Sequence, residues 1–263
     1  MATYTHGHHE SVLRSHTNRT VSNSAAYLAE HLHADAHLLD VGAGPGTITL
    51  DFASRVAQVT ATEIGPDELA LSQRRAAENG VANIDFSVED AHALSFADDT
   101  FDIVHAHQVL QHVADPVQVL REMKRVAKPG GIVAVRDADY AGFFWYPLVP
   151  ELDEWLSLYR AAARANGGEP DAGRRLLSWA RAAGFDDITP TASTWCYATP
   201  SDRAWWGGMW ADRVRESALA RQLVDSGMAT TADLDRIAAG WHRWADAEDG
   251  WFLLPHGEII ARA

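Results

Sequence analysis

The amino-acid sequence predicts an α/β fold with a doubly wound, mostly parallel β-sheet, and three observations lead to this prediction. Between residues 38 and 135, short apolar runs alternate with segments whose apolar residues recur at helical spacing. The first apolar run breaks into a glycine-rich turn, GAGPG, before a helical segment begins. Acidic or histidine side chains follow several of the later runs. Such alternation is typical of a sheet covered by helices on both faces, with ligands bound beyond the carboxyl ends of the strands.

Five strands are expected in this half of the chain. Each is a short apolar run bounded by turn or cap residues, as the buried strands of parallel sheets are. They are expected at residues 37–42, 57–64, 83–90, 101–107 and 132–139. Their carboxyl ends would carry the glycine-rich turn together with Glu63, Asp90, His107 and Asp137.

Helices are expected between these strands, at residues 47–56, 65–80 and 115–131. The second has Pro66 at its first helical position, which suits a helix start because proline has no N–H to leave unpaired. The third begins after Asp115, an expected N-cap, and its apolar stripe is Val119, Leu120, Met123 and Val126. A Pro-Gly-Gly sequence at 129–131 is expected to end it.

The second half of the chain has a different character, because all ten tryptophans lie between Trp145 and Trp251. Helical patterns dominate it, at 150–167, 173–185 and within 201–247. Two strand candidates interrupt them, at 186–198 and 250–263. No internal repeat or flexible linker is evident, so residues 1–263 are expected to form a single domain. Its expected parts are an N-terminal lid or helix at 1–37, a core at 38–139, lid helices at 140–183, and C-terminal hairpin strands with a helical insertion at 184–263.

Composition and charge limit the partners of the protein. The formal net charge of −14 argues against nucleic acid, because phosphate binding needs a basic surface. The single cysteine, Cys196, excludes an intramolecular disulfide. No apolar run is long enough to span a bilayer, and the N-terminus lacks the apolar stretch of a secretory signal. We therefore expect a cytoplasmic protein with a small-molecule substrate and no membrane insertion, and a homodimer remains open.

Gly42, Gly44 and Gly46 follow the first expected strand. Glycine lets the backbone turn tightly and approach a ligand, while the N–H groups of the next helix point toward it. A dinucleotide fingerprint would place its third glycine one position later, where this chain has Thr47. The alternative is that Gly42 only shapes a strand–helix turn.

Two carboxylates specify the expected ligand further. Glu63 ends the second expected strand, where a carboxylate accepts hydrogen bonds from both hydroxyls of a ribose, so a nucleoside is expected. Asp90 would accept a hydrogen bond from the exocyclic amine of adenine, and the N–H of Ala91 would donate to a ring nitrogen.

Four segments together carry a resemblance to a known family. LLDVGAGPG, TATEI, VEDAHALSFADDTFDIVHAHQVLQHVADP and VAKPGG resemble the successive motifs of class I S-adenosylmethionine (SAM)-dependent methyltransferases. The most similar group is that of small-molecule methyltransferases like those of ubiquinone and menaquinone biosynthesis. The resemblance is close over residues 38–135 and holds in outline elsewhere. It implies a Rossmann-like, seven-stranded, mostly parallel sheet with an antiparallel last strand, helical lid insertions, SAM as cofactor and S-adenosylhomocysteine (SAH) as product.

The resemblance also implies roles for individual residues. The glycine-rich turn would lie along the methionine end of SAM, Glu63 would hold the ribose, and Ile64 would flank the adenine. His107 and Gln108 would lie beneath the methyl group and face the acceptor. The expected cofactor-binding residues are Asp40, Gly42, Ala43, Gly44, Gly46, Glu63, Ile64, Asp90, Ala91, His107 and Gln108.

Methyl transfer needs a base only where the acceptor is a hydroxyl or a carbon acid. His107 is the first candidate, and His6, His8 or His9 are alternatives if the N-terminal segment closes over the site. His112 is a further candidate, although a histidine ahead of a capped helix more often satisfies backbone groups. His105 is expected to point away from His107, into the packing. The tryptophan-rich lid suits an apolar or aromatic acceptor, although its aromatic residues would equally well pack on one another. The expected acceptor-binding residues are Tyr4, His8, Arg136, Asp137, Asp139, Tyr140, Phe144 and Trp145.

Histidines are concentrated near the N-terminus, in TYTHGHHESVLRSH. Three interpretations are open: a metal site, a solvated leader, or a lid segment that closes over the cofactor. Two histidines flanking a glycine make a poor preorganised metal site, so no metal is expected.

Two other functions are weighed against methyl transfer. A nicotinamide-dependent oxidoreductase is disfavoured by the position of the third glycine and by the Asp90-Ala91 pair. A SAM-binding protein without catalysis is compatible with every motif of the sequence.

Overall fold

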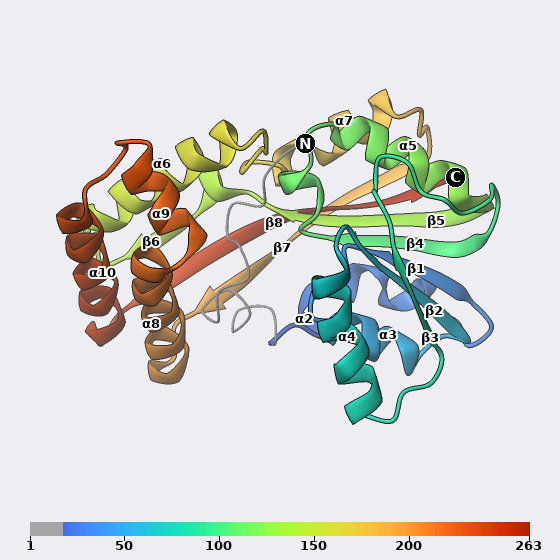
Figure 1. The fold of residues 1–263 in the computed structure, drawn as a ribbon, viewed down its shortest axis with the longest axis horizontal. Helices are drawn as coiled ribbons and strands as arrows, with labels where there is room; N and C mark the ends of the chain where they lie inside the picture. The colour runs from blue at the N-terminus through green and yellow to red at the C-terminus, as the bar shows by residue number, and fades with distance from the viewer. Residues whose placement is uncertain (1–17) are drawn as a thin grey trace.

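The computed structural model describes residues 18–263, and within this part of the chain eight strands form one sheet (Figure 1). The order across the sheet is β3-β2-β1-β4-β5-β8-β6, and β7 pairs with the other edge of β8. The strands are β1 His37–Val41, β2 Gln58–Glu63, β3 Ile84–Val88, β4 Phe101–His107, β5 Ala127–Ala138, β6 Phe144–Tyr146, β7 Ile188–Tyr197 and β8 Trp251–Arg262.

The five strands expected in the first half pair in parallel. The last strand, β8, runs antiparallel to β5, β6 and β7, so the mostly parallel sheet with an antiparallel last strand is confirmed. The predicted number of seven strands is wrong for the described chain, which has eight. The unexpected strand is β6, in a segment assigned to the lid helices. Three residues are too few to show a strand periodicity, and β6 forms because Trp251–Leu253 of β8 extends beyond β5 and pairs with it.

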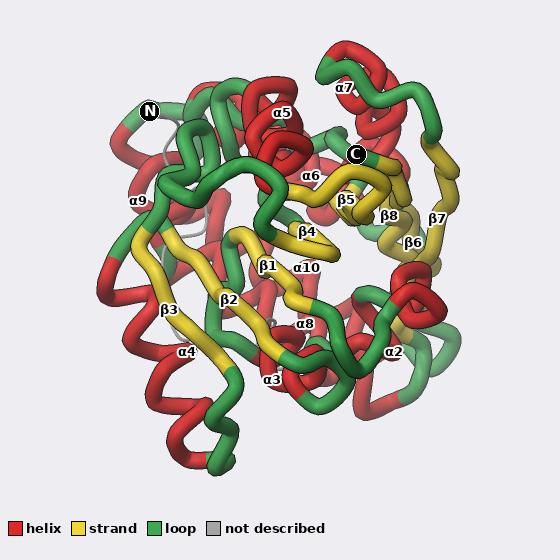
Figure 2. Tube along the Cα trace, turned by 90° about the vertical axis from the view of Figure 1, so that its right-hand side faces the viewer, coloured by secondary structure: helices red, strands yellow, loops and turns green. Residues whose placement is uncertain are grey.

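Helices cover both faces of the parallel strands (Figure 2). The helix η1, with α3 and α4, packs on one face around Leu28, Phe52 and Ala76, and α5 with α7 packs on the other around Met123 and Ala180. Their bounds are α2 Val21–Ser24, η1 Ala26–His31, α3 Thr47–Ala53, α4 Pro66–Glu78, η2 Leu110–His112, α5 Pro116–Val126, η3 Tyr140–Gly142, η4 Gly173–Arg175 and α7 Leu176–Ala182.

The predicted stripe of α5 is confirmed, because all four of its apolar residues are buried. Asp115 caps this helix by accepting a hydrogen bond from the N–H of Gln118 at 2.9 Å. The predicted end at residues 129–131 is wrong: α5 stops at Val126, and β5 begins at Ala127. Ala127 pairs with Phe101, and the register then shifts before β5 pairs regularly with β4 from Ile132 onward. The Pro-Gly-Gly sequence thus lies in the irregular start of a strand.

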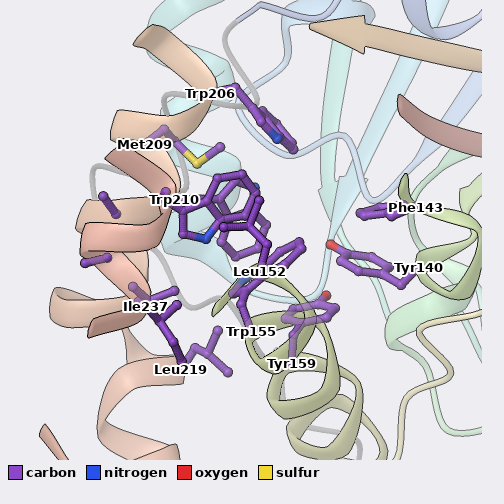
Figure 3. Close-up of a cluster of buried hydrophobic side chains, with 14 of the residues drawn as sticks. Tyr140, Phe143, Leu152, Trp155, Tyr159, Trp206, Met209, Trp210, Leu219 and Ile237 are labelled. Atoms are coloured by element: carbon purple, nitrogen blue, oxygen red, sulfur yellow. The ribbon is translucent and has the colours of Figure 1, made fainter. Parts of the chain in front are cut away.

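Four helices gather at one end of the molecule, beyond the parallel strands, while β7 and β8 run between the two ends (Figure 1). Their aromatic side chains meet in one buried cluster, in which residues of α6 and α8 face Tyr140 and Phe143 (Figure 3). Six of the ten tryptophans are buried here. The helices are α6 Pro150–Ala165, α8 Pro200–Glu216, α9 Ala218–Asp225 and α10 Thr231–Asp246.

Candidate active site

A cavity of about 330 Å³ lies between the carboxyl ends of the parallel strands and the aromatic helices. One side consists of the loops that follow β1, β2, β3 and β4, and the other of residues from β7, α8 and β8. The structure brings twelve of the expected site residues to its lining: Asp40, Gly42, Ala43, Gly44, Glu63, Ile64, Asp90, Ala91, His107, Gln108, His112 and Tyr140.

The three glycines of the loop all have positive φ angles, of 68°, 58° and 77°. A Cβ at Gly44 would meet no atom within 4 Å, so this part of the backbone faces open space. A Cβ at Gly46 would instead lie 2.1 Å from the Ser72 hydroxyl of α4. Gly46 does not line the cavity, and its role in the structure is to let α3 and α4 approach.

Glu63, the last residue of β2, is tied to the glycine loop. Its Oε1 accepts a hydrogen bond from the backbone N–H of Gly44 at 2.5 Å. Burial raises the pKa of this carboxyl to about 7. Asp90, two residues beyond β3, accepts hydrogen bonds from the backbone N–H and the ring of His92, and these bonds lower its pKa. The two carboxylates thus lie at one end of the cavity in different environments.

Asp40 lines the cavity and its side chain is hydrogen-bonded to buried residues of the core. Its Oδ2 accepts a hydrogen bond from the hydroxyl of Thr49 at 2.6 Å, and Oδ1 lies 2.8 Å from Nδ1 of His105. The expectation that His105 points away from His107 is wrong, because residues two apart on a strand share a face. Both side chains are buried on the face that carries α3, where His105 also contacts Phe52.

His107 ends β4 in the middle of the lining. Neither ring nitrogen has a hydrogen-bond partner within residues 18–263. Burial holds the pKa of this histidine well below its ordinary value, and the guanidinium groups of Arg19 and Arg136 lower it further. The imidazole is therefore neutral near pH 7 and has a lone pair available to a ligand.

Gln108 follows with a φ of +55°, an uncommon conformation for a residue other than glycine. Its Oε1 accepts a hydrogen bond from Arg19 at 2.6 Å, and its amide nitrogen lies 2.9 Å from Nε2 of His256. Strained backbone of this kind concentrates at functional sites.

His112, in η2, is a neutral neighbour in the lining. Burial lowers its pKa to about 3, and its Nε2 accepts a hydrogen bond from the side-chain amide of Gln111. Gln111 in turn donates its backbone N–H to Asp137, whose pKa burial raises to about 7.

Several expected acceptor residues lie outside the lining. Arg136 is buried behind Trp195, with its guanidinium 4.8 Å from that ring, and forms an ion pair with Glu258. Asp137 accepts a hydrogen bond from the backbone N–H of Gln111 in η2. Asp139 caps η3 and pairs with Arg174 at 2.6 Å.

The aromatic candidates divide in the same way. Tyr140 lines the cavity and stacks on Tyr159, with ring centroids 4.1 Å apart. Trp145 is buried against Phe252, and Phe144 is about half exposed, and neither lines the cavity. Tyr4 and His8, like the histidine-rich leader, lie outside the described residues.

The lining residues that the sequence does not predict include Arg19, Trp195, Trp210 and Arg213. Trp206, Trp210 and Arg213 are spaced by four and three residues on α8, which places them on one helix face, and this spacing was a usable signal. Arg19 and Trp195 carried no such signal, because only long-range packing brings them to the cavity.

Between residues 18 and 263, no three His, Cys, Asp or Glu side chains are arranged to hold a metal ion. No helix in the same range is long and apolar enough to cross a membrane.

Comparisons with known proteins agree with this geometry. A family model described as a methyltransferase domain matches residues 32–184, more than half of the chain. An uncharacterized methyltransferase of Schizosaccharomyces pombe is 34% identical, over 98% of this chain and 95% of its own. The crystal structure of the cyclase SpnF has a TM-score of 0.56 at 24% identity, covering 96% of this chain and 80% of that one.

A second solved structure, phosphoethanolamine N-methyltransferase 2 of Haemonchus contortus in complex with SAM, has a TM-score of 0.55 at 18% identity. It covers 90% of this chain and 51% of that one. The similarity to these two solved structures shows the fold alone. The family match and the Schizosaccharomyces relative show the family to which the chain belongs. The chain belongs to the methyltransferase domain family and, within it, to the class I SAM-dependent methyltransferases.

Proposed function

We propose that this protein transfers a methyl group from SAM to a small apolar or aromatic acceptor and releases SAH. The observation that carries the proposal is that one cavity is lined by both the Gly44–Glu63 pair and the neutral ring of His107. Glu63 would accept hydrogen bonds from the ribose hydroxyls, and Asp90 with Ala91 would bind the adenine edge. The open space at Gly44 fits a ligand that lies directly against the backbone.

In such a reaction the residues of the protein would align the acceptor, accept its proton and exclude water. SAM supplies a methyl group that is already activated by a positively charged sulfur. His107 would accept the proton of an acceptor hydroxyl, because its ring lines the cavity and neither ring nitrogen has a hydrogen-bond partner within residues 18–263. Trp195 of β7 and the tryptophans of α8 would align the acceptor and exclude water.

Calorimetry with SAH and with NAD tests the cofactor, because a methyltransferase binds the first and an oxidoreductase the second. A methyl-transfer screen against quinols, phenols and amines then tests the reaction. The net charge of −14 supports a small molecule over a nucleic acid as the acceptor.

A second candidate is a SAM-binding protein that does not transfer the methyl group. The fold likeness to a cyclase favours keeping it, because that protein's name describes a different reaction on this fold. Tight SAH binding without methylation of any compound in the screen would favour this candidate.

A further inference from the structure

His92, two residues after Asp90, also lines the cavity. It gives Oδ1 of Asp90 two hydrogen bonds, from its backbone N–H at 2.9 Å and from Nδ1 of its ring at 2.8 Å. Oδ2 of the same carboxylate accepts no hydrogen bond from residues 18–263. One oxygen of Asp90 is therefore bound by the protein, and the other is left for a ligand.

The ring of His92 is also held on its other side. Its Nε2 accepts a hydrogen bond from the backbone N–H of Asp115, the N-cap of α5, at 3.4 Å. A ring nitrogen that accepts a hydrogen bond carries no proton, so the ring proton is on Nδ1 and is donated to Asp90. This bond matters because 40% of the Asp90 side chain is exposed, and packing alone leaves such a carboxylate free to rotate.

The backbone around His92 is fixed without the ring. The side-chain amide of Gln118 donates to the carbonyl of His92 at 3.2 Å, and Glu122 accepts the backbone N–H of Leu94 at 3.0 Å. Both partners belong to α5, and both bonds use only backbone atoms of the segment after β3. Loss of the ring should therefore leave this segment in place and let the Asp90 carboxylate turn.

We propose that His92 is a positioning residue for the cofactor: by holding Oδ1 of Asp90, it aims Oδ2 at the exocyclic amine of adenine and lets the site distinguish adenine from hypoxanthine. This inference rests on the proposed function. Hypoxanthine has a carbonyl oxygen in place of the amine and a proton on N1. A fixed carboxylate would then face an acceptor, and the N–H of Ala91 would face another donor. A site whose polar groups cannot turn rejects this reversed pattern, because those groups would stay unpaired.

The test compares SAH with S-inosylhomocysteine, which is SAH with hypoxanthine in place of adenine, by calorimetry. We expect the wild-type protein to bind SAH at least about tenfold more tightly. His92→Leu removes the donor and should reduce this preference at least about fivefold, mainly through weaker SAH binding. His92→Asn places an amide N–H where Nδ1 lies and should keep most of the preference.

His33→Leu is the matched control. Its ring also pairs with an aspartate two residues away, Asp35, at 2.7 Å, but neither residue lines the cavity. This variant should keep the full preference for SAH. Where His92→Leu does not fold, His92→Ala takes its place.

Equal binding of the two ligands by the wild-type protein would overturn the inference whatever the variants do. So would an unchanged preference in folded His92→Leu, including an equal weakening of both ligands, because the ring would then act on the structure alone. A loss of preference in His92→Asn as large as in His92→Leu would show that the bond to Asp90 is not the cause. Each of these outcomes leaves the proposed function standing, whereas a wild-type protein that does not bind SAH overturns the function and this inference together.

Discussion

The backbone N–H of Gly44 donates a hydrogen bond to Oε1 of Glu63 at 2.5 Å, and this contact joins the glycine loop after β1 to the end of β2. The two residues are 19 positions apart in the chain, and the pairing of β1 with β2 brings their strand ends to the same edge of the sheet. We expect the ribose of a nucleoside to lie against this pair.

Glu63→Ala should abolish detectable SAH binding without unfolding the protein. The variant loses a pair of charge-assisted hydrogen bonds to the ribose, which costs on the order of 3 kcal/mol, or roughly a hundredfold in affinity. Calorimetry measures the loss and circular dichroism the fold. Glu78→Ala, at the exposed end of α4, is the control and should bind SAH normally. Unchanged affinity in a folded Glu63→Ala protein would refute the ribose role.

The same carboxyl predicts a pH dependence of binding. Its pKa of about 7 means that a fraction of the ligand-free protein is protonated at neutral pH, and a protonated carboxyl cannot accept two hydroxyl donors through charge-assisted bonds. SAH affinity should therefore fall as the pH is lowered from about 8 to about 6. Glu63→Gln should bind weakly at every pH in this range. A wild-type affinity that does not vary with pH would contradict the raised pKa.

Asp137 predicts a pH dependence of stability. Burial raises its pKa to about 7, so the folded chain binds this proton more tightly than the unfolded chain, in which the pKa is about 4. Between these values the folded chain holds the extra proton, and the free energy of unfolding falls as the pH rises.

Asp137→Asn, which can still accept the N–H of Gln111, should reduce this fall. Thermal unfolding of the ligand-free protein between about pH 5 and about pH 8 measures the difference. Asp225→Asn, an exposed position at the end of α9, is the control. Equal slopes for wild type and Asp137→Asn would count against the assignment.

Replacing Gly44 or Gly46 by alanine should change stability and SAH binding to different extents. At Gly46 the new Cβ would overlap the Ser72 hydroxyl in addition to adopting a positive φ, so the variant should lose on the order of 2 kcal/mol of stability or more. At Gly44 the Cβ enters open space, so a smaller loss of about 1 kcal/mol should accompany weaker SAH binding. Thermal unfolding and calorimetry on both variants decide. A larger loss of stability in Gly44→Ala than in Gly46→Ala would show that the glycine loop changes its position.

His107→Asn should lower turnover roughly a hundredfold or more on a hydroxyl acceptor identified in the screen, while SAH affinity stays within about twofold. His112→Asn is the comparison, because that ring already accepts a hydrogen bond from Gln111, and it should cost less than about tenfold. If turnover falls more in His112→Asn than in His107→Asn, the two roles are exchanged. If neither variant is slower, no base is used.

Removal of the N-terminal leader should weaken SAH binding and lower turnover but keep the fold. A chain that starts at Thr20 keeps Val21, which is buried, and loses Arg19, which lines the cavity. Arg19→Met in the full-length chain separates the arginine from the leader. Amide exchange of residues 4–16 with and without SAH tests whether the leader closes over the site. Equal exchange in both states, with normal turnover of the truncated protein, would exclude a lid.

The expectations that succeeded rest on local patterns. An apolar run of five or six residues and a cap such as Asp115 have a strong preference for one local structure, so the parallel strands and α5 were identified. The predicted end of α5 is wrong because Ala127 pairs with Phe101 as the first residue of β5 and does not continue the helix. β6 was not predicted because three residues have no strand preference of their own, and this strand forms by pairing with β8.

The sequence by itself determined the parallel core, the glycine loop and the carboxylates at the strand ends, because these features depend on short segments whose periodicity and turn chemistry act locally. Only the tertiary structure decided which side chains line the cavity on the side across from the glycine loop and the carboxylates. Arg136 pairs with Glu258 behind Trp195, while Arg213 comes from α8, which begins more than ninety residues after the end of β4. Contacts between such distant segments follow from how β7, β8 and α8 pack, and no local pattern encodes that packing.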